Sequence, residues 1–270
     1  MPELPEVENT RRNLVRAGLP GCTITGANIT WANTVKKPSA AELAAGLRDR
    51  TIQDVQRRGK YLILPLSGGG PAAFIVHLGM TGRLRVQPQS QEPDPMTRHF
   101  FPLDDGRELR FVDGRKFGKL WLVDSPNEVL PTMSPEPFDD EFTVETLAES
   151  FAGRKAALKA LLLEQSVACG LGNLYADESL FLAGLHPERP ASELSVEEIA
   201  RLRQAIIDSL TAAYGVYDRA RDQDWPDPPT ALTTWSHPRD IKAGCPNCGT
   251  NMTAIRVRAR STYFCAECQV

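Results

Sequence analysis

The hydrophobic pattern of this chain changes period once, and that change limits the folds it can adopt. Before residue 124, short runs of apolar residues alternate with polar positions and are separated by Gly and Pro, as in "TIQDVQRRGKYLILPL" and "AAFIVHLGM". Beyond residue 142, apolar residues recur at helical spacing, as in "SVEEIARLRQAIIDSLTAAYG". A period of 2 predicts strands and a period of 3.6 predicts helices. We therefore expect an α+β chain with more than one domain.

The strand-rich part, residues 1–130, predicts an antiparallel sandwich or barrel, because it contains several short strands at regular spacing. One helix over about 5–17 should flank this domain. Val7 and Leu14 lie on or near one face of that helix, and Gly18 is a helix stop signal.

A stretch rich in proline and acidic residues separates the two patterns. Eight acidic residues and no Lys or Arg occur from Asp124 to Glu149. We expect a linker over 131–150, a helical domain over 151–240 and a separate C-terminal module over 241–270.

The overall charge conceals local differences. The net charge is −3 and the isoelectric point is about 5.9, which taken alone argues against a nucleic-acid-binding protein. Positive charge is nevertheless concentrated at 48–60, 115–119 and 256–260. Screening limits the reach of a charge to about 10 Å at 0.1 M salt, so a polyanion responds to these local surfaces.

The six cysteines fall into two groups. Cys22 and Cys169 are isolated, and we expect them to be small buried residues. The other four form two close pairs: Cys245, Cys248, Cys265 and Cys268. Two Cys-x2-Cys pairs are typical of a tetrahedral zinc site, and four thiolates leave no open coordination position, so the zinc should be structural. Two disulfides are the alternative, which a reducing cytosol disfavours.

A glycine-rich turn joins two predicted helices in "EQSVACGLGNLYADESLF". Its glycines, beside Asn173, allow backbone N–H groups and the Asn173 amide to approach an anion at the start of the second helix. Arg260 lies five residues before Cys265 in the basic C-terminal module. We expect the turn and this arginine to contact phosphate groups from two sides.

Long motifs make this chain resemble the bacterial formamidopyrimidine-DNA glycosylase family, which also includes endonuclease VIII. They span nearly the whole chain: "PELPEVE" (2–8), "RRGKYL" (57–62), "HLGMTGRL" (77–84), "DGRKFG" (113–118), "LLLEQSVACGLGNLYADESLF" (161–181) and "RSTYFCAECQ" (260–269). The resemblance implies an N-terminal antiparallel β-sandwich, a helix–two-turn–helix domain and a zinc-finger β-hairpin. It implies a bifunctional DNA glycosylase and lyase that cleaves the strand by β,δ-elimination.

The resemblance assigns the chemistry to the first residues of the chain. Removal of Met1 exposes the secondary amine of Pro2. The pKa of an α-amino group is about 8, so a fraction of the molecules carries a neutral amine at physiological pH. A neutral amine can attack C1′ of a damaged nucleoside. By the same resemblance Glu3 is the acid/base carboxylate, and Glu6 has a supporting role nearby. Without the resemblance, both glutamates would be explained as charges that favour a helix start.

Five further residues have DNA-binding or catalytic roles by the resemblance. Lys60 and His77 match lysine and histidine contacts to phosphate, and Lys60 is counted with the catalytic residues, as is Arg260. Met80, Arg115 and Phe117 match the family's wedge, which fills the space left by a flipped base. Without the resemblance, Lys60 would be a surface lysine and the apolar residues would be core.

Residues 214–244 depart from the family pattern, which has a glycine-rich lesion-capping loop where this chain has a segment with Pro and Trp.

We expect oxidised purines as substrates. Oxidised pyrimidines, as for endonuclease VIII, are the alternative. A non-catalytic zinc-finger DNA-binding protein is a third possibility, and the presence of Pro2, Glu3 and Lys60 argues against it.

The remaining expectations concern partners and location. The chain should bind damaged double-stranded DNA and one structural Zn²⁺, and should act as a monomer. It has neither a signal-peptide pattern nor an apolar run long enough to cross a membrane. We expect it in the bacterial cytoplasm, associated with the nucleoid.

Overall fold

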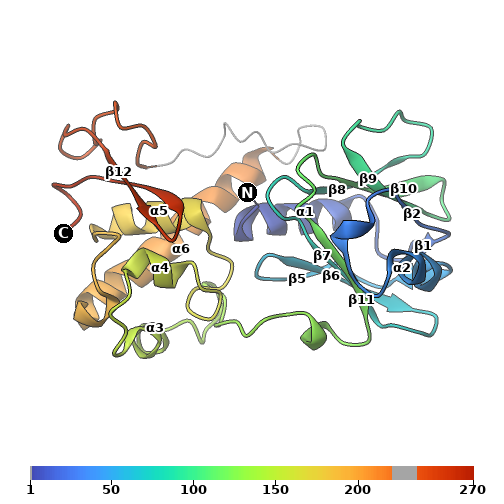
Figure 1. Ribbon diagram of the computed structural model, residues 1–270, viewed down its shortest axis with the longest axis horizontal. Helices are drawn as coiled ribbons and strands as arrows, with labels where there is room; N and C mark the ends of the chain where they lie inside the picture. The colour runs from blue at the N-terminus through green and yellow to red at the C-terminus, as the bar shows by residue number, and fades with distance from the viewer. Residues whose placement is uncertain (1, 221–235) are drawn as a thin grey trace. The chain divides into compact units, whose positions relative to one another are not determined.

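The computed structural model describes residues 2–220 and 236–270 of the chain (Figure 1). The chain divides into two compact units, Met1–Pro131 and Thr132–Val270, called unit 1 and unit 2 below. The division follows the change of period in the sequence, since the two larger sheets lie in unit 1 and the helices from α3 onward in unit 2.

Unit 1 contains two α-helices and eleven strands among its described residues. They are α1 (Leu4–Arg16), β1 (Thr23–Ile24), β2 (Asn28–Ile29), β3 (Val35–Lys37), α2 (Ala40–Leu47), β4 (Arg50–Ile52), β5 (Gln56–Arg58), β6 (Tyr61–Ser67), β7 (Ala73–His77), β8 (Arg83–Pro88), β9 (Thr97–Pro102), β10 (Arg107–Val112) and β11 (Lys119–Val123). A seven-stranded sheet has the order β1-β4-β6-β7-β11-β3, with β5 paired to β6, and a four-stranded sheet has the order β2-β9-β10-β8.

The two sheets of unit 1 pack face to face as a sandwich. Phe74 of β7 and Phe101 of β9 meet edge to face between them, with ring centroids 5.2 Å apart. Leu62 and Leu64 of β6 have no exposed surface, as the period-2 pattern predicts for an inward face. The expected antiparallel sandwich is confirmed, with one exception: β3 pairs with β11 in parallel.

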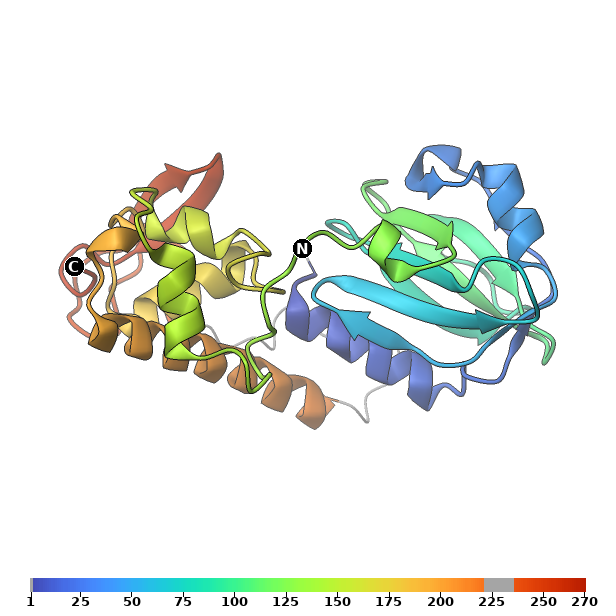
Figure 2. The ribbon, with the colours of Figure 1, turned by 90° about the horizontal axis from the view of Figure 1, so that it is seen from below.

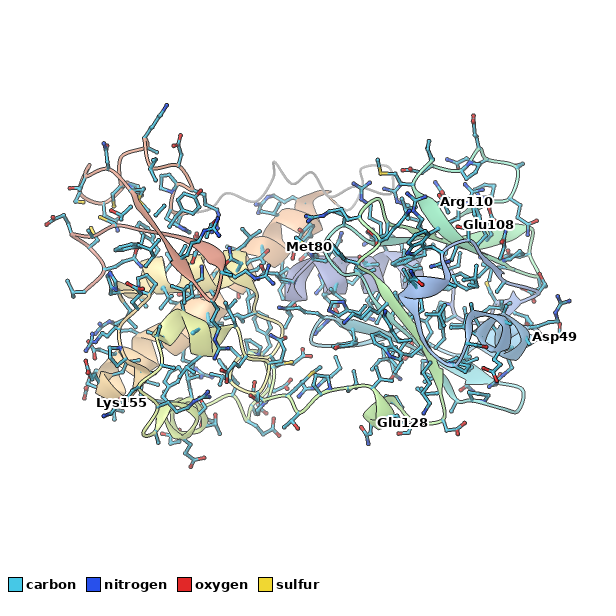
Figure 3. All side chains as sticks on the ribbon, viewed as in Figure 1. Asp49, Met80, Glu108, Arg110, Glu128 and Lys155 are labelled. Atoms are coloured by element: carbon cyan, nitrogen blue, oxygen red, sulfur yellow. The ribbon has the colours of Figure 1, made fainter. Side chains whose placement is uncertain are left out.

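Helix α1 confirms the expected N-terminal helix and begins one residue earlier than predicted. Its buried residues include Leu4, Val7 and Leu14, and it packs against β5, β6 and β8 (Figure 2). Gly18 follows the helix with φ +69°, a conformation that favours glycine. Strand β10 also holds a buried ion pair, in which the Arg110 Nε donates to Glu108 Oε1 at 2.6 Å (Figure 3).

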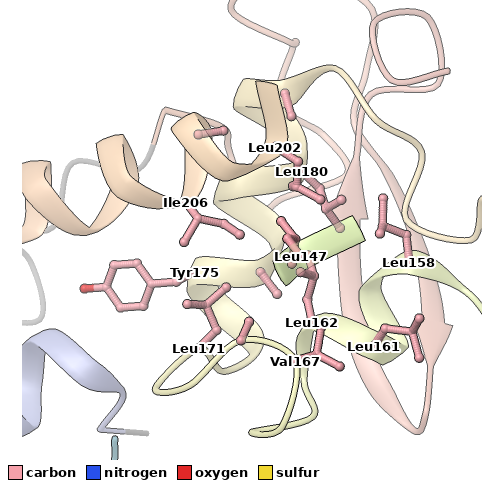
Figure 4. Packing of buried hydrophobic residues seen from close by; sticks show 14 of the residues in the cluster. Leu147, Leu158, Leu161, Leu162, Val167, Leu171, Tyr175, Leu180, Leu202 and Ile206 are labelled. Atoms are coloured by element: carbon pink, nitrogen blue, oxygen red, sulfur yellow. The ribbon is translucent and has the colours of Figure 1, made fainter. Parts of the chain in front are cut away.

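Unit 2 is helical and ends in a hairpin. Its elements are α3 (Val144–Phe151), α4 (Leu158–Leu162), α5 (Asn173–Ala183), α6 (Val196–Ala220), β12 (Thr253–Val257) and β13 (Arg260–Phe264). Leu158, Leu180, Leu202 and Ile206 belong to one apolar core to which all four helices contribute (Figure 4). No helix of the described ranges is both long and apolar enough to span a bilayer.

Two boundaries differ from the sequence expectation. The linker expected over 131–150 is too long, because Phe142, Leu147 and Phe151 are buried in the core of unit 2. The Thr143 hydroxyl accepts a hydrogen bond from the Thr146 N–H and caps α3, so this acidic stretch is folded. Helix α6 continues beyond the expected end near residue 215, because its next turn adds buried side chains.

Candidate active site and nucleic-acid interface

The first turn of α1 brings three of the predicted catalytic residues together. Glu3 is the N-cap residue and is completely buried, while Pro2 beside it is partly exposed. The Glu6 carboxylate accepts a hydrogen bond from the Glu3 backbone N–H at 2.8 Å. This bond caps the helix and fixes the backbone that carries Glu3. Glu6 therefore supports the site by holding the backbone of Glu3 in place.

Helix α1 is fixed to the sheet by Glu8, which the sequence analysis did not single out. Its carboxylate accepts hydrogen bonds from Arg11 and Arg12 on the same helix and from Arg57 on β5, at 2.8–3.0 Å. Burial raises the pKa of Glu8, but these bonds outweigh burial and lower it to about 2. Arg11 and Arg12 lie three and four residues after Glu8, a spacing that predicts ion pairs on one helix face, so the sequence indicated this part of the cluster.

Lys60 and His77 lie at neighbouring strand ends. Lys60 is in the turn between β5 and β6, and His77 ends β7 opposite Tyr61, with ring centroids 4.9 Å apart. The His77 Nδ1 accepts a hydrogen bond from the Gly79 N–H at 3.1 Å, which leaves the proton of the neutral ring on Nε2. Burial, with the charges of Lys60 and Lys119, lowers the pKa of His77 to about 4. His77 is thus a neutral hydrogen-bond donor at physiological pH.

The three predicted wedge residues occupy two loops that touch. Met80 lies in the turn after β7 (Figure 3), and Arg115 and Phe117 lie between β10 and β11. A side chain at Gly79 would come within 2.5 Å of the Phe117 backbone, so only glycine allows this approach. Phe117 is 51% exposed, and the Arg115 guanidinium carbon lies 5.1 Å from its ring centroid. An exposed aromatic ring stacked against a cation suits insertion between bases.

Asp113 joins these two loops and was missed by the sequence analysis. It is completely buried, and its Oδ1 accepts hydrogen bonds from the Thr81 hydroxyl at 2.7 Å and the Arg115 N–H at 3.2 Å. Its Oδ2 accepts from the Gly118 N–H at 2.8 Å. One carboxylate therefore fixes both ends of the loop that carries Phe117. In the sequence, "DG" indicates only a turn.

In unit 2, the glycine-rich turn is held from inside by Gln165. Its side-chain oxygen accepts from the Gly170 N–H at 3.0 Å, and its amide donates to the Leu171 carbonyl at 3.1 Å. Helix α5 then begins at Asn173, whose Nδ2 donates to the Ser261 carbonyl at 3.0 Å. The sequence did not distinguish Gln165 from other polar residues of the turn.

The structure brings Asn173 close to Arg260, the two residues of unit 2 that the sequence predicts to contact phosphate. Arg260 is exposed at the start of β13, one residue before the Ser261 carbonyl that Asn173 binds. The hairpin turn before it, Arg258 and Ala259, has positive φ at both residues. The Arg258 guanidinium binds Glu164 at 2.6 Å, which ties this turn to the end of α4.

The four paired cysteines converge at the base of the β12–β13 hairpin. Their Sγ atoms all lie within 4.8 Å of one another, with Cys245 to Cys268 at 3.9 Å and Cys248 to Cys265 at 3.5 Å. Sulfur atoms in a tetrahedral site lie about 3.8 Å apart when each Zn–S bond is about 2.3 Å. The residues therefore fit a zinc ion, and the spacing excludes disulfides between them. Cys22 and Cys169 are buried as expected.

The site residues divide between the two units. Unit 1 carries Pro2, Glu3, Lys60 and the wedge, and unit 2 carries Asn173, Arg260 and the cysteines. Part of the divergent stretch at 214–244 lies outside the described residues.

The comparisons with known proteins follow the same division. Residues 1–120 match the formamidopyrimidine-DNA glycosylase N-terminal domain, and residues 133–219 match the H2TH domain of the same enzymes. A formamidopyrimidine-DNA glycosylase of Pelotomaculum thermopropionicum is 40% identical over all of this chain and 99% of its own, and one of Acaryochloris marina is 37% identical over 100% and 99%.

Solved structures agree with these matches. A Lactococcus lactis FPG mutant in complex with Fapy-dG-containing DNA has a TM-score of 0.88 and 31% identity, and covers 99% of each chain. MutM (FPG) of Thermus thermophilus has a TM-score of 0.84 and 35% identity, and covers 99% of this chain and 98% of its own. The protein is thus a DNA glycosylase of base excision repair. It belongs to the formamidopyrimidine-DNA glycosylase family.

Proposed function

We propose that this chain excises oxidised purines, formamidopyrimidines and 8-oxoguanine, from double-stranded DNA and then cleaves the strand at the abasic site. The observation that carries the proposal is Pro2 beside the buried carboxyl group of Glu3 at the start of α1. The family supports the reaction class, and the Lactococcus relative with Fapy-dG DNA supports the substrate class. The neutral His77 and the exposed Arg260 supply donors for backbone phosphates.

The proposed reaction begins after Met1 is removed. The neutral amine of Pro2 attacks C1′ of the damaged nucleotide, and the bond from C1′ to the base breaks with the electron pair leaving on the base, which takes up the proton that the Pro2 nitrogen loses. Glu3 donates a proton to O4′ as the sugar ring opens, which leaves an iminium between Pro2 and C1′. Loss of the C2′ proton expels the 3′ phosphate, a second elimination expels the 5′ phosphate, and hydrolysis of the iminium releases Pro2.

The test of this chemistry is borohydride trapping on a duplex that contains 8-oxoguanine. Reduction of the iminium should give a covalent protein–DNA adduct, and peptide mapping should find it at Pro2. The matched control is a protein with Met1 retained by an N-terminal extension, which should give no adduct. An adduct at Lys60 would contradict the assigned nucleophile. Binding without any adduct would favour the non-catalytic DNA-binding alternative.

A panel of lesions tests the substrate class. Duplexes with formamidopyrimidine, 8-oxoguanine, thymine glycol and dihydrouracil should be compared at one enzyme concentration under single-turnover conditions. Faster excision of the two purine lesions is expected. Faster excision of the pyrimidines would make this an endonuclease VIII-like enzyme with the same Pro2 chemistry.

We also propose that the four-cysteine site holds one structural Zn²⁺. The Sγ separations support a tetrahedral thiolate site with no position left for substrate. When bound, the ion supplies a cross-link between the two ends of the hairpin chain and takes no part in the reaction. Metal analysis should give one zinc per chain, and folded, active protein without zinc would contradict the proposal.

The proposed location is the bacterial cytoplasm, in association with the nucleoid. A DNA substrate and bacterial relatives support it, and thiolate ligands are retained in a reducing compartment. Fractionation of the source cells should recover the protein with DNA in the cytoplasmic fraction. Recovery from a periplasmic or membrane fraction would exclude it.

A further inference from the structure

A buried lysine reaches from α4 to the DNA-binding hairpin. Lys159 has no exposed surface, and its Nζ donates to the Thr262 hydroxyl at 2.7 Å and to the Ser261 carbonyl at 3.2 Å. The same ammonium group forms an ion pair with Asp177 Oδ1 on α5 at 2.5 Å. A lysine is rarely buried this completely unless its charge is paired, so the arrangement requires these partners.

Asp177 continues the same network to the chain segment that precedes the cysteines. Its Oδ2 accepts a hydrogen bond from the Arg239 guanidinium at 2.7 Å and lies 3.4 Å from the backbone nitrogen of Tyr263. The Arg239 guanidinium also lies 5.0 Å from the centre of the Tyr263 ring. Three successive residues of β13, 261 to 263, are thus bound to charged side chains of unit 2.

The two residues that Lys159 binds, Ser261 and Thr262, precede Cys265 by four and three residues and directly follow Arg260. The strand rises about 3.3 Å per residue, so the five steps from Arg260 to Cys265 span about 16 Å. A two-stranded hairpin is marginally stable in water without further packing. A zinc ion at the cysteines therefore fixes one end of the hairpin and leaves the end that carries Arg260 dependent on other contacts.

We propose that Lys159 and Asp177 are positioning residues that hold Arg260 in register for a DNA phosphate, independently of zinc. This inference rests on the proposed function, in which Arg260 contacts the DNA backbone. Lys159 is too deeply buried to contact DNA itself, so its effect on binding passes through Ser261 and Thr262 to the neighbouring Arg260. The Asn173 side chain of α5 donates to the same Ser261 carbonyl, so side chains of α4 and α5 both hold the residue next to Arg260.

A double-mutant cycle tests the proposal with a duplex that carries a tetrahydrofuran abasic-site analogue. Arg260→Ala and Lys159→Met should each weaken binding by about tenfold, as expected for loss of a hydrogen bond from a charged group. If Lys159 acts through Arg260, the double variant should bind no more than about threefold more weakly than either single variant. Independent effects would multiply to about a hundredfold and would overturn the proposal.

Two further variants keep the result interpretable. Thr262→Val removes only the hydroxyl that Lys159 binds, at nearly constant shape, and should weaken binding in the same direction if Lys159→Met fails to fold. Lys155→Met removes an exposed lysine four residues earlier (Figure 3) and should bind as wild type. Zinc content should be unchanged in all variants. Unweakened binding by Thr262→Val together with Lys159→Met would contradict the proposed role.

Zinc removal distinguishes the contribution of the cysteine site from that of Lys159 and Asp177 in positioning the hairpin. In chelated protein, wild type should still bind the duplex several-fold more tightly than Arg260→Ala, because the Lys159 end of the hairpin stays docked. Equal binding by the two zinc-free proteins would mean that zinc alone positions Arg260. Failure of zinc-loaded wild type to prefer the abasic-site duplex over undamaged DNA would instead count against the proposed function.

Discussion

Arg115 has a side chain that only donates hydrogen bonds, and this property predicts a preference for the base opposite the lesion. Once the damaged nucleotide is flipped, cytosine presents two acceptors on its pairing edge, whereas adenine presents one acceptor beside a donor. Arg115 is exposed, and its backbone is held by Asp113. We therefore expect excision opposite C to exceed excision opposite A by about tenfold to a hundredfold.

Single-turnover excision opposite C and opposite A measures this preference, and Arg115→Ala should reduce the ratio. The matched control is Lys116→Ala in the same loop, since the Lys116 ammonium lies 3.7 Å from the centre of the Trp31 ring and is engaged there. A C-to-A ratio that survives Arg115→Ala unchanged would show that another residue reads the opposite base.

His77 predicts a specific loss of stability in mild acid. Its pKa is about 4 in the folded protein and about 6.5 in an unfolded chain, so the unfolded state binds protons first as the pH falls. The contribution of the neutral His77 to the free energy of unfolding is therefore fully present above about pH 7 and is lost as the pH falls from 6.5 towards 4. His99, buried and also with a pKa of about 4, acts with the same sign.

Urea unfolding at pH 7 and pH 5 checks this expectation. Each histidine should account for a loss of about 1–2 kcal/mol between these pH values. His77→Gln should remove its share of the pH dependence, whatever its effect on stability at pH 7. A pH dependence identical to wild type would mean that His77 is protonated in the folded state at pH 5.

At the scale of elements, the two loops that form the wedge should move as one unit because Asp113 binds both. Asp113→Ala leaves the Thr81 hydroxyl and two backbone N–H groups without this acceptor, at a cost of about 1–3 kcal/mol in stability. It should slow excision of 8-oxoguanine more than cleavage of a preformed abasic site, because a flipped base is no longer needed there. Asp124→Ala, an exposed aspartate of unit 1, is the control.

Thermal unfolding and the two rates should be measured on the same protein. Equal slowing of both reactions would mean that Asp113 affects folding alone. Slowing confined to intact lesions would support a role in base flipping through the wedge.

Local signals explain why some elements were predictable and others were not. Helix α1, the β12–β13 hairpin and the cysteine cluster depend on residues close in sequence. The helical spacing beyond residue 142 correctly indicated α3, but the linker was expected to run on to residue 150, where Leu147 and Phe151 are part of the core of unit 2. Asp113 and Lys159 were missed because a buried charge is explained only by partners far along the chain, although a lone lysine in "AALKALLL" was a usable signal.

At the scale of the whole molecule, the two units carry different parts of the proposed reaction. The nucleophile and its carboxyl partner belong to unit 1, whereas Asn173, Arg260 and the zinc site belong to unit 2. Sequence motifs assigned each residue to its unit. The residues that hold these motifs in place, such as Gln165 beneath the glycine-rich turn, were not predicted. Their roles depend on packing that the sequence pattern does not specify.

This division predicts that zinc chelation separates binding from chemistry. Removing the metal releases the cysteine end of the hairpin and should weaken DNA binding, while unit 1 stays folded because none of the four cysteines belongs to its core. Abasic-site cleavage should therefore show a raised KM and a largely retained kcat, with the strand signal of unit 1 preserved by circular dichroism. Added zinc should restore the KM. A lost kcat at saturating DNA, with unit 1 still folded, would mean that the chemistry itself depends on the zinc-bound hairpin.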